Sequence, residues 1–178
     1  MSMNKNVNVW YWSPREEDET RDAETRALNA VTNAMYQQKQ MVFQTRPLLP
    51  TDLGLPTDNA FINYTGITGA GTFTIVNIQS TPQARPFAIF GFRNLNGTAT
   101  GVITGIQAVV NGETKPLKPI PLTLSWNEYS EKTVYFSPLY VTSPNIPVQI
   151  NLTAAASAAS VSFELIGITA QASGATLS

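Results

Sequence analysis

The stretch from about residue 61 to residue 171 is divided into short runs rich in Val, Ile, Thr and Phe. Turn residues separate these runs at intervals of about 8–12 residues. Several runs alternate apolar with polar side chains, as a strand with one buried face does. Such a series, with no helices between the strands, predicts an antiparallel β-sandwich or barrel, and we favour a jelly roll. The predicted strands are 61–65, 72–79, 86–93, 101–110, 113–118, 120–125, 132–141, 146–153 and 160–170.

Local signals add detail to this pattern. The dipeptide Asn111-Gly112 lies between two of the runs and predicts a tight hairpin. Pro116, Pro119 and Pro121 cannot donate backbone hydrogen bonds, so the sequence around them is expected at a sheet edge or in short pieces.

Side-chain alternation also predicts the faces of two strands. Val161, Phe163 and Leu165 are expected on one face of the strand 160–170, opposite Ser162 and Glu164. In the strand 86–93, the same rule predicts that Phe87, Ile89 and Gly91 share one face and that Phe90 and Phe92 share the other.

A helix is predicted before the strands, over residues 14–43. Ser13 is suited to the N-cap, Pro14 to the first helical position and Glu16 to a capping box. Pro47 should end the helix by Arg46. The helix has one narrow apolar face built mainly of small residues, which suits close packing against another surface. We therefore predict a helical arm at 1–45, a proline-rich linker at 46–60 and a β-sandwich at 61–178.

Composition narrows the function classes. The 178 residues include no cysteine and no histidine, which removes thiolate metal sites, disulfides and the commonest general base. Only 13% of residues are charged, against about a quarter in an average globular protein. We interpret this as a surface that largely meets other protein; the alternative is a surface kept in water by neutral Thr and Asn side chains.

Charge placement bears on the partners. Six of the twelve acidic residues lie between positions 16 and 24, so the predicted helix is acidic, and no basic cluster follows it. We therefore expect no nucleic-acid partner, since such a partner requires clustered Lys and Arg. No apolar run approaches the roughly 20 residues of a membrane span, and residues 1–12 do not resemble a secretory signal. We expect folding in a host cytoplasm.

The sequence contains no strong motif for catalysis, phosphate binding or metal binding. Glu128 and Glu131 have no signature spacing, and the glycines of 66–72 lack the Lys-Ser/Thr of a phosphate loop. Asp52 and Asp58 are too sparse for a metal site. We predict no catalytic residue, no cofactor and no metal.

Aromatic and apolar residues outside the predicted core suggest binding positions. Trp10, Tyr11 and Trp12 are candidate anchors in a neighbouring subunit, although they could also lie on the chain's own sandwich. The predicted docking stripe of the helix is Leu28, Val31 and Met35. Trp126 and Tyr129 are expected in the core or in a subunit contact, and if exposed they could stack on a sugar.

The capped helix at 13–43, the linker at 46–60 and the Thr/Gly/Asn-rich sandwich ending in 146–171 together resemble accessory proteins of icosahedral virus particles. The resemblance is to head decoration or cement proteins of tailed bacteriophages. It implies a non-catalytic virion protein that binds other capsid proteins and forms homo-oligomers, with a trimer favoured. Two alternatives stay open: a carbohydrate- or receptor-binding module of a viral fibre or spike, and a small jelly-roll coat protein.

Overall fold

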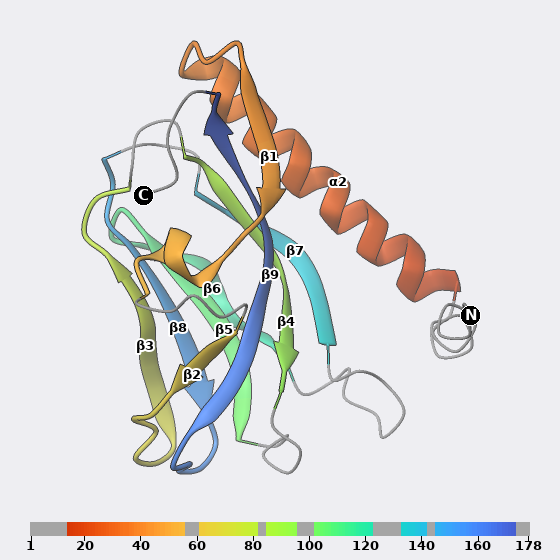
Figure 1. Cartoon of the computed structure of the whole chain (residues 1–178). Helices are drawn as coiled ribbons and strands as arrows, with labels where there is room; N and C mark the ends of the chain where they lie inside the picture. Colours follow the sequence, from red (N-terminus) through yellow and green to blue (C-terminus); the bar gives the residue numbers. More distant parts are fainter. Residues whose placement is uncertain are drawn as a thin grey trace, which may run out of the picture.

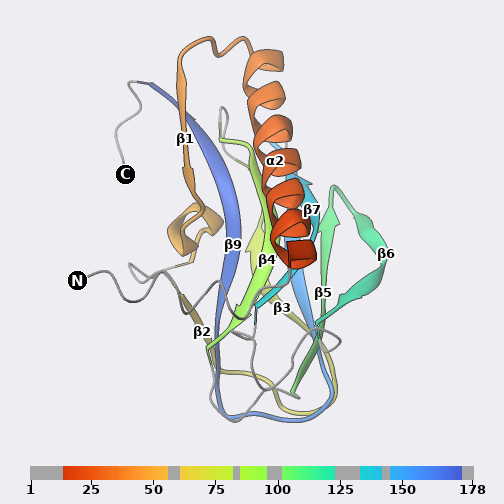
Figure 2. The same cartoon turned by 90° about the vertical axis from the view of Figure 1, so that its right-hand side faces the viewer.

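The computed structural model describes residues 14–55, 61–81, 85–95, 102–122, 133–141 and 145–173. They form three layers: a helix, a five-stranded antiparallel sheet and a four-stranded antiparallel sheet (Figures 1 and 2). The elements are α2 (Pro14–Gln37), β1 (Phe43–Pro47), the 3-10 helix η1 (Pro50–Leu53), β2 (Ile62–Tyr64), β3 (Gly71–Ile78), β4 (Phe87–Asn94), β5 (Ile103–Val110), β6 (Glu113–Pro121), β7 (Thr133–Val141), β8 (Val148–Ala154) and β9 (Val161–Ala172).

The strand order is that of a jelly roll. One sheet runs β1-β9-β4-β7, with β2 also pairing with β9, and the other runs β3-β8-β5-β6. From β2 onward, each successive strand lies in the other sheet, except that β5 and β6 form a hairpin within one sheet. This arrangement is the two-sheet jelly roll of eight strands, with its first strand divided into β1 and β2. The predicted fold class is confirmed.

The predicted hairpin is confirmed at residue level. Val110 pairs with Glu113 across a two-residue loop, and Asn111 and Gly112 have φ angles of 52° and 80°. Positive φ at both positions defines the type I′ turn, for which Asn-Gly is the preferred sequence. Strand β6 lies at a sheet edge, as its prolines predict, and its pairing with β5 is interrupted between Ile106 and Ala108.

Strand β4 departs from simple alternation. Phe87, Ile89 and Phe92 belong to the core between the sheets, whereas Ala88 and Phe90 pack on the opposite face under α2. The register shifts between Ile89 and Gly91 in the pairing with both neighbours, so Phe90 has no register partner in either strand. One inserted residue reverses which face the later side chains occupy. The prediction that Phe92 shares a face with Phe90 was therefore wrong.

Helix α2 ends earlier than predicted, at Gln37 rather than near residue 43. The Gln40 N–H donates to the Met35 carbonyl at 2.9 Å and the Lys39 N–H donates to the Tyr36 carbonyl at 2.9 Å. These two bonds, with Lys39 at φ 58°, form a Schellman motif in which lysine occupies the position usually taken by glycine. Without a glycine, the stop signal is not visible in the sequence.

The predicted linker is part of the folded body. Residues of β1 pair with β9, from Phe43 opposite Ala172 to Pro47 opposite Ile168. Leu48, Pro50 and Leu53 are buried. The jelly roll thus begins at residue 43, and the predicted start at residue 61 lies inside it.

Helix α2 covers the outer face of the β1-β9-β4-β7 sheet (Figure 2). Ala27, Val31 and Met35 are completely buried there. The sheet residues that pack against this stripe of the helix are Ala88, Phe90 and Ala170, with Phe43, Tyr135, Ile166, Ile168 and Ala172 at the margin. Small side chains at positions 23, 27 and 34 let the helix approach the sheet closely. Burial of Val31 and Met35 stabilises the contact by about 1.5–3 kcal/mol each.

This contact tests the role assigned to the helix. We expect Met35→Ala to lower the free energy of unfolding of the isolated chain by about 2–5 kcal/mol, because it leaves a cavity against the sheet. Leu28→Ala is the matched control; Leu28 is 39% exposed, so the loss should be under about 1 kcal/mol. Denaturant unfolding of both variants measures the difference, and equal small losses would mean that the helix does not pack on its own sheet in solution.

Candidate interaction surface

The predicted site residues fall into three groups. Val31 and Met35 are buried against the chain's own sheet, so the prediction that they dock on a neighbour was wrong. The reason is that the outer face of this sheet is itself apolar and requires cover. Leu28 lies beside this stripe and is half exposed. Trp10, Tyr11, Trp12, Trp126 and Tyr129 lie outside the described residues.

Within the described residues, no group of three or more acidic side chains is arranged to hold a metal ion. The described helices do not combine the length and the hydropathy that crossing a membrane requires.

An apolar corner lies where α2 turns into β1, and we define it as Tyr36, Met41, Val42 and Phe43. Met41 is 75% exposed, Val42 69% and Tyr36 52%. The rings of Tyr36 and Phe43 meet edge to face with centroids 5.5 Å apart, which fixes the tyrosine beside the strand. Exposed neighbouring apolar side chains of this size mark a contact surface more often than single scattered ones.

The corner continues into an edge of the sheet. Strand β1 has β9 on one side and no strand on the other among the described residues (Figure 2). The Ser173 N–H donates to the Val42 carbonyl at 3.0 Å, and the Leu48 N–H donates to the Gly167 carbonyl at 2.9 Å. Hydrogen-bonded pairs alternate along an antiparallel ladder, so even-numbered residues of β1 face β9. The backbone groups of the odd-numbered residues 43, 45 and 47 therefore face the outer edge.

Pro47 limits this edge. Its nitrogen has no hydrogen to donate, so the outward row has N–H donors at Phe43 and Thr45. Proline at an edge position is a common device that shortens the stretch available for pairing with another strand. The usable edge of β1 is thus the part nearest the apolar corner.

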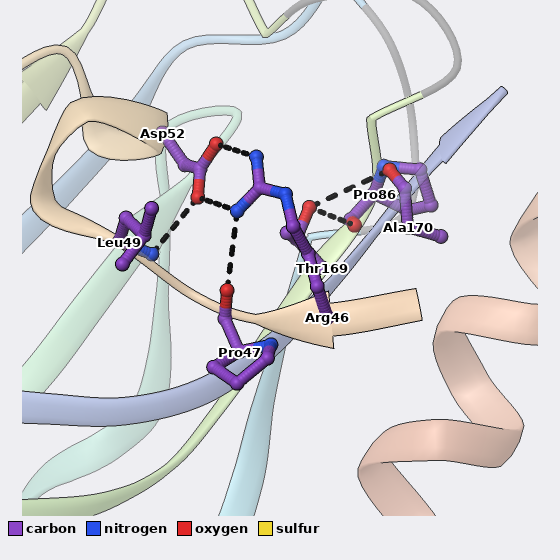
Figure 3. A network of polar contacts seen from close by, with 7 residues as sticks. All are labelled: Arg46, Pro47, Leu49, Asp52, Pro86, Thr169 and Ala170. Atoms are coloured by element: carbon purple, nitrogen blue, oxygen red, sulfur yellow. Dashed lines mark hydrogen bonds and ion pairs between the residues drawn. The ribbon is translucent and has the colours of Figure 1, made fainter. Parts of the chain in front are cut away.

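An ion pair fixes the far end of β1 (Figure 3). Arg46 Nη1 and Nη2 donate to Asp52 Oδ2 and Oδ1, each at 2.7 Å, and Nη1 also donates to the Pro47 carbonyl at 3.1 Å. Asp52 Oδ2 accepts the Leu49 N–H at 2.8 Å, which caps η1. The hydrogen bond to Asp52, together with its charge, raises the pKa of the Arg46 guanidinium, while burial acts in the opposite direction. Asp52 therefore neutralises the positive charge that Arg46 would otherwise bring to this edge strand.

Sequence reasoning missed this pair, because Asp52 was considered only as a metal ligand. A usable signal exists: Pro50 begins a helical turn, Asp52 is at its third position and Gly54 follows at φ 73°. Proline at the start and glycine after the end are typical of a short capped helix.

On the outer face of the other sheet, the paired residues of β3, β8 and β5 are uncharged, which follows from alternation and register, whereas the edge strand β6 carries the exposed Lys118. Val148, Ile150 and Leu152 of β8 are buried, so Gln149, Asn151 and Thr153 point outward. Residues directly opposite each other share a face. The face contains three rows, which are Thr72-Thr153-Gly105, Thr74-Asn151-Gln107 and Asn77-Gln149-Val109-Thr114. We call these ten residues the amide face; none of them is charged.

The amide face is internally ordered. Thr74 Oγ1 donates to Asn151 Oδ1 at 2.8 Å across the β3–β8 pair, and Gln79 Nε2 donates to Asn77 Oδ1 at 3.0 Å. Nearby charges lie on β6, where Lys115 and Glu113 pair at 3.1 Å and Lys118 is exposed. Exposed α2 residues, by contrast, include Asp22 and Arg26, paired at 2.7 Å. The two broad faces of the molecule thus differ in charge.

Comparison with known proteins gives little more than fold likeness. No family model matches the chain, and no curated protein matches it. Two similar solved structures are the infectious bursal disease virus VP2 subviral particle, at 12% identity and TM-score 0.37, and the infectious bursal disease virus Gx strain, at 12% identity and TM-score 0.35. Each match covers 74% of this chain but only 32% and 33% of the respective matched chains. At these values the likeness carries no functional conclusion.

The Arg46–Asp52 pair should contribute measurably to stability. Asp52→Ala removes both hydrogen bonds that Arg46 donates to Asp52 and leaves the Leu49 N–H without its acceptor, so we expect a loss of about 1–3 kcal/mol in the free energy of unfolding. Asp22→Ala breaks an exposed helical pair and should cost less than about 0.5 kcal/mol. Thermal and denaturant unfolding compare the two, and similar losses would contradict a fixing role for Asp52.

Proposed function

We propose that this chain is a non-catalytic structural protein of a virus particle, which stabilises a shell through contacts with neighbouring subunits. The observation that carries the proposal is the apolar corner, which exposes Tyr36, Met41 and Val42 beside the outer edge of β1. A jelly roll is a common architecture of viral capsid domains, although lectins share it. The jelly-roll fold therefore gives only general support, and the proposal depends on the apolar corner and the outer edge of β1.

The corner and the edge suit a partner that is itself a protein. An extended segment can add to a free sheet edge through backbone hydrogen bonds, while neighbouring apolar side chains supply affinity. Here the backbone groups of Phe43 and Thr45 face outward next to Met41 and Val42. The absence of cysteine and histidine from the sequence makes a catalytic role less favoured.

Within this class, we propose a decoration, cement or minor capsid protein that acts as a homo-oligomer, with a trimer favoured. A small coat protein that itself forms the shell is the alternative, and the stoichiometry of purified particles separates the two. A glycan-binding module has no support from the described surface, since Trp126 and Tyr129 lie outside it.

The apolar corner can be tested in the full-length chain. We expect Met41→Ser combined with Val42→Ser to weaken self-association, or binding to purified particles, by at least about tenfold, because each side chain contributes apolar burial. Analytical ultracentrifugation and particle co-sedimentation measure this. Leu95→Ser is the control: Leu95 is 44% exposed, and it lies at the opposite end of β9. An unchanged double variant, or a wild-type chain that stays monomeric and does not bind particles, would overturn the proposal.

The leading segment is a second test. We propose that Trp10, Tyr11 and Trp12 anchor in a neighbouring subunit, which leaves α2 on its own sheet. Deletion of residues 1–12 should then leave the unfolding temperature within a few degrees while reducing particle binding at least about tenfold. Full binding by the shortened chain would refute the anchoring role, and a large drop in unfolding temperature would place the segment on its own body.

A further inference from the structure

The outer edge of β1 has the features of a site for an added strand. The backbone N–H and carbonyl groups of Phe43 and Thr45 face away from β9. Exposed apolar side chains lie at both ends of the strand, with Met41 and Val42 before it and Leu49 after it. The edge strands β3, β6 and β7 contribute none of the exposed large apolar side chains found among the described residues. A strand with an apolar face would therefore meet apolar partners at β1.

The sequence of residues 4–12, NKNVNVWYW, has the pattern of such a strand. Val7, Val9 and Tyr11 alternate with asparagine and tryptophan, and the stretch contains no glycine or proline. Valine and aromatic residues favour strands, and a period of two gives a strand with two distinct faces. A single strand is not stable by itself, because its backbone groups need a partner strand.

The edge of β1 lies out of reach for this stretch of its own chain. Pro14 and Tyr36, near the two ends of α2, lie about 33 Å apart at roughly 1.5 Å per residue. The ring of Tyr36 contacts Phe43, so it marks the level of the edge, and Figures 1 and 2 show the start of α2 far from β1. Val9 extends at most about 18 Å from Pro14, and the aromatic residues after it extend less. They fall roughly 15 Å or more short.

We propose that residues 4–12 of one copy add as an antiparallel strand to the outer edge of β1 in a second copy. This inference rests on the proposed assembly function and names the occupant of its edge and corner. The antiparallel direction places the aromatic residues 10–12 at the apolar corner and the earlier residues toward Pro47. The ladder ends there, because Pro47 has no N–H and its carbonyl accepts from Arg46.

The pairing also selects a face for the added strand. With Val9 opposite Thr45, Tyr11 is opposite Phe43, and the outward backbone groups of the two β1 residues gain partners. Opposite residues share a face, so Tyr11 lies beside Phe43, whose ring meets that of Tyr36. Each copy offers one segment and one edge, so the exchange can close into a ring such as the proposed trimer.

Disulfide trapping tests this pairing, since the chain has no native cysteine. Thr45→Cys is combined in turn with Val7→Cys, Asn8→Cys and Val9→Cys in the full-length chain in its assembled form. Side chains of a paired strand alternate between faces, so linked oligomers should form at least about tenfold faster with cysteine at position 7 or 9 than at position 8. The matched control replaces Thr45→Cys by Thr72→Cys, which is exposed on the edge strand β3 and should give only the background rate.

The products distinguish the possible results. Rates that are equal at the three positions and no faster than the control, with all variants folded and assembled, would overturn the strand addition and leave the assembly function intact. A maximum at Asn8 would overturn the proposed pairing. A disulfide closed within one chain would overturn the assignment to a second copy. Failure of the wild-type chain to self-associate or to bind particles would instead refute the proposed function.

Discussion

The β1-β9-β4-β7 sheet is apolar on both faces, and the contact with helix α2 is what makes this possible in water. On one side Phe92 and Phe163 stack in the core at 5.2 Å between centroids; on the other, Phe90 and Ala170 lie beneath Val31 and Met35. Without the helix, the second apolar face would meet solvent. The position of β1 depends on the same contact, because the turn that follows α2 delivers the chain to the edge of this sheet.

Much of the fold could be predicted from sequence because strands and turns are local signals. The runs that became β3 to β9 alternate or carry branched residues, and Asn111-Gly112 specifies its turn by itself. Strand β1 could not be found in this way. Its five residues, FQTRP, show no clear alternation, and their conformation is set by pairing with β9 at the other end of the chain.

The binding residues were harder to predict than the fold. Val31 and Met35 were correctly recognised as one apolar stripe, but a stripe does not say which surface covers it. The answer lay in β4, where Ala88 and Phe90 lie under the helix. The register shift after Ile89 places Phe92 in the core, whereas alternation alone would place it under the helix as well. The amide face was visible as separate Thr, Asn and Gln positions, yet only the register brings Thr74, Asn151 and Gln107 into one row.

The place of β9 has a consequence for biosynthesis. This strand comes last among the described strands, yet it lies between β4 on one side and β1 and β2 on the other. While the ribosome still holds it, the earlier strands of that sheet have no central partner, and the apolar face under α2 is incomplete. Long-range pairing of this kind slows folding and delays it until β9 has been synthesised. The completed edge and corner can therefore exist only on chains translated through β9, which keeps truncated chains out of any assembly that uses them.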